Sequence, residues 1–152
     1  MATGLIGGHT GGYPQKTYMF LVCGTEGSET ITKGNVVEWA TDTQAGTANA
    51  GAACVQSDGD QPPIGIACNS AAAGEIVRVQ TGGPSEVATA VASGESTAQH
   101  LLLGGAAGEL VSVAAGSATA AQQGYVLGLC LAASTSSVQA AGDILLFPRG
   151  AY

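Results

Sequence analysis

The sequence predicts a compact all-β fold, a sandwich or barrel that is jelly-roll-like or β-tulip-like, preceded by an extended N-terminal arm. Three observations predict it. Short runs of branched and aromatic residues are bounded by glycine, which is typical of strands. A pattern of glycine, a polar residue and two aliphatic residues occurs four times. No long segment carries an aliphatic stripe at helical spacing.

Residues 1–16 are predicted to form the arm. They hold five glycines, one proline and a single charged side chain, Lys16, without a hydrophobic period. Such a segment gains order by lying along another surface. The alternative is a frayed terminus without a partner. Residues 17–152 are expected to form one β domain, because a chain of 152 residues suits a single core.

The domain is expected to open with a buried strand over Thr17–Cys23, a run of aromatic and branched residues that ends at Gly24. Four further strands are expected to follow glycine turns, because glycine adopts positive φ readily. These four strand openings are Gly34-Asn35-Val36-Val37, Gly74-Glu75-Ile76-Val77, Gly108-Glu109-Leu110-Val111 and Gly142-Asp143-Ile144-Leu145.

A second pattern, aliphatic–Gly–aliphatic, precedes the second and fourth openings. It occurs at Ile64-Gly65-Ile66 and at Leu127-Gly128-Leu129, and a cysteine follows each within two residues. The repeated order predicts an internal duplication, with units of about 34–82 and 108–150. The alternative is that glycine simply precedes strands often in turn-rich β proteins.

Charged residues make up 10% of the chain, against about 25% in a typical domain, and the net charge is −7. The four cations are scattered, so a nucleic-acid-binding patch and attraction to an anionic membrane are not expected. No apolar stretch approaches the roughly 20 residues of a transmembrane helix. Residues 1–8 lack the pattern of a secretory signal, so we expect synthesis in a cytoplasm and buried, reduced thiols.

Motifs for catalysis and metal binding are not found. The chain lacks the Gly-x-Ser-x-Gly and phosphate-loop patterns, and no two cysteines or histidines have zinc-ligand spacing. Asp58-Gly59-Asp60 resembles the start of a calcium loop, but Asn69 stands where the bidentate Glu is needed, which favours a surface turn. We therefore expect no enzyme activity, no cofactor and no metal. A cleft lined by two or more of Glu75, His100, Glu109 and Asp143 would favour an enzyme or ligand-binding protein instead.

Residues 96–142 carry one charged side chain, Glu109. A segment of this length is too long to be all core, so part of it is expected to be an interface. Helical signals over 86–100 and 114–123 are weak, and at most a short turn of helix is expected in each.

The run Ile64-Gly65-Ile66-Ala67, followed by Gly74-Glu75-Ile76-Val77-Arg78-Val79, resembles the signature of small tailed-phage head decoration, or cement, proteins. A similar match recurs over Val126–Leu131 and Ala140–Phe147, so the resemblance covers roughly residues 34–150.

The resemblance implies a capsid decoration protein. Such a chain binds the outer surface of an icosahedral head as a homotrimer and stabilises contacts between major capsid protein subunits. Its place would be the virion surface, after assembly in the host cytoplasm. The alternative is another phage structural module, such as a head fibre base, tail or minor capsid component. Candidate capsid or subunit contacts are Leu5, Ile6, His9, Tyr13 and Tyr18.

Overall fold

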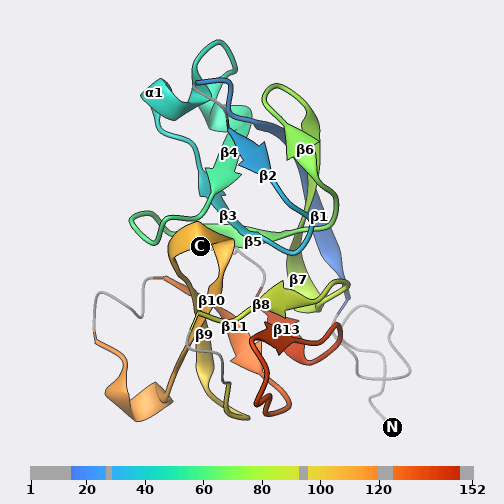
Figure 1. Cartoon of the computed structure of the whole chain (residues 1–152), viewed down its shortest axis with the longest axis vertical. Helices are drawn as coiled ribbons and strands as arrows, with labels where there is room; N and C mark the ends of the chain where they lie inside the picture. The colour runs from blue at the N-terminus through green and yellow to red at the C-terminus, as the bar shows by residue number, and fades with distance from the viewer. Residues whose placement is uncertain (1–14, 27–28, 93–95, 120–124, 148–152) are drawn as a thin grey trace, which may run out of the picture.

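The structure, a computed structural model, describes residues 15–26, 29–92, 96–119 and 125–147, and most of its regular elements are β-strands. The predicted all-β fold class is confirmed. Figure 1 shows an upper group of strands in blue and green and a lower group in yellow to red. Strand β7 (Ile76–Pro84) pairs with members of both groups.

The other strands of the upper group are β1 (Thr17–Cys23), β2 (Thr30–Ile31), β3 (Val36–Trp39), β4 (Ala53–Gln56), β5 (Pro63–Ala67) and β6 (Ala71–Ala72). The lower group contains β8 (Thr89–Ala90), β9 (Leu101–Gly104), β10 (Leu110–Val113), β11 (Val126–Cys130), β12 (Val138–Gln139) and β13 (Ile144–Leu146).

The upper strands close into a five-stranded barrel. Their order is β1-β4-β3-β5-β7, and β7 pairs again with β1. The β1–β4 pair is parallel, whereas the other pairs in the ring are antiparallel. Closure removes the free strand edges that an open sheet would present to other chains. The sequence allowed either a sandwich or a barrel, and the upper strands form a barrel.

The lower strands repeat this pairing. The antiparallel order β4-β3-β5-β7 has its counterpart in β10-β9-β11-β13, and the β2–β6 ladder in the β8–β12 ladder. Leu110 of β10 also forms an isolated parallel bridge with Val91, which follows β8, whereas the parallel partner of β4 is β1, which precedes β2.

The pairing aligns the two halves differently from the repeated strand openings. By pairing, β3 corresponds to β9, whereas the openings at Gly34 and Gly108 would align β3 with β10. An alignment by pairing would compare residues 30–84 with 89–146. The predicted duplication over 34–82 and 108–150 stays a prediction, and the pairing supplies an alternative register for it.

Each of the four strand openings has a glycine at positive φ in a β-turn, and the Gly108 turn differs from the others because Ala107 also has positive φ (57°). Gly34, Gly74, Gly108 and Gly142 all have positive φ, between 70° and 94°. In each, the N–H of the following residue donates to the carbonyl three residues earlier, as in Asn35 to Thr32 and Asp143 to Ala140. Glycine at the third position of a β-turn with positive φ allows this geometry without a steric clash. The glycine turns predicted from the sequence are therefore confirmed.

The two aliphatic–Gly–aliphatic runs are central strands, β5 and β11. A Cβ atom at Gly65 would lie 2.1 Å from the carbonyl oxygen of Gln80 on β7. A Cβ atom at Gly128 would lie 2.3 Å from the carbonyl oxygen of Leu145 on β13. Each glycine therefore permits close contact between two backbones at the same place in its group of strands.

Two apolar cores lie on opposite sides of strands β3 and β5. The first, inside the barrel, contains Leu21, Val37, Val77 and their neighbours. The second contains Leu102, Leu110, Leu127, Ile144 and Leu146 of the lower group, together with Val36 and Ile66 from the outer face of the barrel. Because upper strands complete the second core, the two groups pack as one body.

The helix α1 (Asp42–Ala45) is an element that the sequence analysis did not predict. Thr41 begins it with a capping box, in which its side chain accepts from the Gln44 N–H while the Gln44 side chain accepts from the Thr41 N–H. Its buried residue Ala45 packs with Ala53 and Val55 of β4. The outer face of β4 is therefore covered by a helix.

Two other predictions from the sequence can be compared with the structure. Strand β1 has the predicted bounds, but only one of its faces is buried, since Phe20 is 70% exposed. In the described parts of 86–100 and 114–123, the regular elements are β8 and the short 3₁₀ turn η3 (Ala115–Ser117). In these described parts the alanines form no α-helix, which agrees with the prediction of at most a short turn of helix in each segment.

We predict that Gly65→Ala and Gly128→Ala each lower the free energy of unfolding by about 1–3 kcal/mol, because the added methyl group must displace a backbone carbonyl. Gly116→Ala is the matched control, since nothing lies within 4 Å of its Cβ position, and its effect should stay within about 0.5 kcal/mol. Urea unfolding of the three variants measures the difference. Equal stabilities for all three would contradict the proposed contacts.

Candidate interaction surface

The outer face of the β1–β7 pair bears the two most exposed large apolar side chains of the described residues. Phe20 is 70% exposed and Ile76 is 64% exposed. In the antiparallel register Val22 pairs with Ile76, and Phe20 pairs with Arg78. We call Phe20, Val22 and Ile76 the β1–β7 apolar patch.

The patch follows from the alternation of side chains along two strands. Leu21 and Cys23 of β1 and Val77 and Val79 of β7 point into the barrel core. The residues that alternate with them point outward. They are Phe20, Val22 and Ile76, which are apolar where a solvated face would usually be polar, together with the charged Arg78. The helix that covers β4 does not extend this cover to the patch, which is consistent with the exposure of Phe20.

Tyr18 is the one predicted contact residue that lies within the described part of the chain. Leu5, Ile6, His9 and Tyr13 lie outside the described residues. Tyr18 is half-buried on the outer face of β1, two residues from Phe20. It therefore borders the apolar patch.

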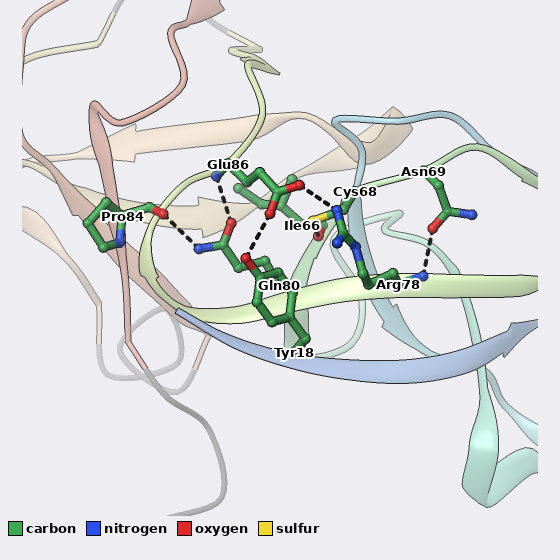
Figure 2. A network of polar contacts seen from close by, with 8 residues as sticks. All are labelled: Tyr18, Ile66, Cys68, Asn69, Arg78, Gln80, Pro84 and Glu86. Carbon is green, nitrogen blue, oxygen red and sulfur yellow. Dashed lines mark hydrogen bonds and ion pairs between the residues drawn. The ribbon is translucent and has the colours of Figure 1, made fainter. Parts of the chain in front are cut away.

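A polar network limits the patch on the side of Tyr18 (Figure 2). The Tyr18 hydroxyl donates to Glu86 Oε2 at 2.7 Å, and the Arg78 guanidinium pairs with Glu86 Oε1. The same guanidinium lies 5.2 Å from the centre of the Tyr18 ring, a cation–π distance. Two strands and the segment after β7 are thus joined on one surface.

Gln80 supports this network from beneath. Its side chain is fully buried and donates to the carbonyls of Pro84 at 2.7 Å and Gly82 at 3.0 Å. Its Oε1 accepts from the Glu86 N–H at 2.7 Å. One amide therefore fixes the turn that carries Glu86, and with it the position of the Glu86 carboxylate.

The hydrogen bond between Tyr18 and Glu86 changes the pKa of both side chains. The Tyr18 hydroxyl, which donates to Glu86, lowers the pKa of that carboxyl, and the charges of Arg78 and Lys16 lower it further against the opposing effect of burial. Because Glu86 accepts a hydrogen bond from the Tyr18 hydroxyl, Glu86 also raises the pKa of Tyr18. The ionised carboxylate is therefore the form that this surface favours.

Of the four polar residues considered for a cleft, Glu75 and His100 make local contacts. Glu75 Oε2 accepts from the Ala72 N–H at 2.8 Å within its own turn. His100 Nδ1 lies 3.1 Å from Ser112 Oγ, across the β9–β10 hairpin. Within the described residues, no hydrogen bond or ion pair joins any two of Glu75, His100, Glu109 and Asp143.

The four cysteines are all buried, and none forms a disulfide. Burial raises the pKa of Cys54 to about 12, and burial likewise raises the pKa of Cys23 and of Cys68. Thiols that hold their protons this firmly are poor nucleophiles and poor metal ligands. Three of the four lie in strands, and Cys68 follows the end of β5.

Among the residues that the structure describes, no three His, Cys, Asp or Glu side chains are placed to hold a metal ion. In the same residues, no helix has the length and apolar character needed to cross a membrane.

The sequence does not reveal the exposure of Phe20, because alternation is invisible in the run over 17–23, where both faces are apolar. Arg78, two residues after Ile76 in β7, is the one polar signal that marks the outer face of that strand. Only the pairing of β1 with β7 and the placement of the core decide which apolar side chains remain outside.

The chain matches none of the known protein-family profiles, and no curated protein has a significantly similar sequence.

We predict that Tyr18→Phe raises the pKa of Glu86 toward its ordinary value, because the hydroxyl donor to its carboxylate is removed. Because the folded pKa is depressed, the stabilisation from Glu86 is present above its unfolded pKa and is lost as pH falls through the folded value. Carboxyl ¹³C NMR titration measures the change, with Tyr125→Phe as the control. An unchanged Glu86 pKa in Tyr18→Phe would show that the hydrogen bond is not the main cause.

Proposed function

We propose that this chain is a capsid decoration, or cement, protein that binds the outer surface of an icosahedral phage head. It stabilises contacts between subunits of the major capsid protein and acts there as a homotrimer. The observation that carries the proposal is the β1–β7 apolar patch, an uncovered hydrophobic face on a closed barrel.

The position of the patch supports a role in attachment. Phe20 and Ile76 are large side chains on paired strands, so their surroundings are held by the barrel and need no ordering on binding. On association, the side chains of Phe20 and Ile76 are then the main groups that lose conformational entropy. Aromatic anchors of this kind often contribute most of the affinity of a protein interface.

The predicted arm is connected to the same strand. Residues 1–14 lead into Gln15, Lys16 and then β1, so contacts made by Leu5, Ile6 or Tyr13 would add to those of Phe20. Two attachments on one chain, and three chains in a trimer, raise avidity without a single strong site. A ligand that binds only the assembled shell stabilises it by mass action.

The sparse charge of the chain supports the same role. Only 10% of residues are charged, so much of the surface can meet protein without removing water from many ions. Around the patch, Arg78 is already paired with Glu86. An apolar partner surface would therefore not leave that cation unpaired.

The first experiment measures oligomeric state and head binding. Light scattering of the purified chain should give the mass of a trimer, and the chain should sediment with intact undecorated heads of the phage that encodes it and raise their melting temperature. A monomer that does not bind such heads would overturn the proposal. Binding to tail or fibre structures alone would favour another phage structural role.

The second experiment tests the patch itself. We predict that Phe20→Ser weakens head binding by about tenfold or more, because truncating a buried aromatic anchor costs above about 1.4 kcal/mol. The fold should persist, since Phe20 lies outside both cores. Leu131→Ser is the matched control, an exposed apolar residue (46%) outside the patch, and should bind normally. Equal binding by both variants in a sedimentation assay would remove the patch from the interface.

A further inference from the structure

Glu38 is a fully buried carboxyl group that neither the fold nor the proposed function explains. It lies on β3, where it pairs with Val55 of β4 and with Pro63 of β5. Val36, two residues earlier on the same strand, packs into the second core. Glu38 therefore lies near the boundary between the two groups of strands.

The contacts of Ser57 connect Glu38 to the lower group. Ser57 Oγ donates to Glu38 Oε2 at 2.9 Å, while the Ser57 carbonyl accepts from the Gly108 N–H at 2.9 Å. Gly108 lies in the turn between β9 and β10. A Cβ atom at Gly104, which ends β9, would lie 3.0 Å from Ser57 Oγ. The segment 57–60 is thus packed between Glu38 and this turn.

One oxygen of the carboxyl group is unsatisfied. Glu38 Oε1 is buried without a hydrogen-bond partner, which is costly for a charged carboxylate. Asp58 follows Ser57 directly in the chain, and its charge acts on Glu38. A proton on Glu38 removes the negative charge that makes the unpartnered oxygen costly.

The electrostatic surroundings favour that proton. Burial raises the pKa of Glu38 to about 7, the charge of Asp58 also raises it, and the Ser57 hydroxyl acts in the opposite direction. Strands β4, β5, β9 and β10 carry no Asp, Glu, His, Lys or Arg, and their only thiol, Cys54, lies in the first core. The remaining charged groups nearby in the chain are Asp60, in the same segment, and Glu109, in the β9–β10 turn.

We propose that protonated Glu38 forms a pH-sensitive junction between the two groups of strands. With the proton present, Glu38 holds segment 57–60 through Ser57, and Ser57 holds the β9–β10 turn through Gly108. When the proton leaves to solvent, a buried carboxylate with an unpartnered oxygen remains near the charge of Asp58, and the segment separates from the turn. This inference does not depend on the proposed function.

The direction of the pH dependence follows from linkage. The folded chain keeps the Glu38 proton up to a pH at which the unfolded chain, with an ordinary glutamate, has already lost it. The added stability is therefore full at acidic pH, declines as pH rises between the two values, and is absent above the folded value. Opening of the junction is expected as pH rises through neutrality.

Hydrogen exchange on the full chain tests the junction. Between about pH 6 and about pH 8.5, the protection factor of the Gly108 amide, corrected for intrinsic exchange, should fall by about tenfold, the equivalent of one pKa unit. The Gly142 amide, which donates to the Ser85 carbonyl at 2.9 Å, is the internal control and should keep its protection. In Glu38→Gln, a neutral mimic of the protonated group, Gly108 protection should not vary with pH.

Carboxyl ¹³C NMR of Glu38 provides a second measurement. Its midpoint should lie near neutrality in the native chain and fall in Asp58→Asn, which removes the nearby charge. This variant keeps the test valid if Glu38→Gln does not fold. A Glu38 midpoint in the ordinary carboxyl range, or equal loss of Gly108 protection in the native chain and Glu38→Gln, would overturn the proposal.

Discussion

Strand β7 is the constraint on which the rest of the structure depends. Its first half pairs with β1 and β5 and closes the barrel, while Gly83 and Pro84 at its end pair with β13 of the lower group. One continuous backbone therefore fixes the position of both groups. Gln80 stabilises the point of transition, because its buried amide bonds three backbone groups of the following turn.

Two polar sites lie where the groups of strands meet, and they have different physical character. The Tyr18–Arg78–Glu86 network is partly exposed, and its carboxylate is stabilised by donors and positive charge. Glu38 is buried near the charge of Asp58 and favours its protonated form. The two carboxyl groups, Glu86 and Glu38, are therefore shifted in opposite directions by their surroundings. Acidic conditions should weaken the first site and strengthen the second.

The proposed role in assembly depends on which outer faces of the barrel are covered by other elements and which are exposed. Helix α1 covers the outer face of β4, and the lower group covers the outer side of Val36 and Ile66. The β1–β7 face is left with Phe20 and Ile76 in solvent. The five-stranded barrel has no free edge, so a partner that meets it at this face contacts side chains rather than adding a strand. The predicted N-terminal arm continues from the same strand.

The sequence by itself determined the local features of this protein. Glycine at positive φ marked the four turns, the aliphatic–Gly–aliphatic runs marked β5 and β11, and Thr17–Cys23 was bounded correctly, because turn chemistry and strand composition act over a few residues. Strands β4 and β9 were missed, since small or uniform residues give little periodic signal. Only the tertiary structure decided which apolar side chains face solvent, which strands correspond between the halves, and that Glu38 is buried near the charge of Asp58. These depend on contacts between segments far apart in the chain, which no local pattern encodes.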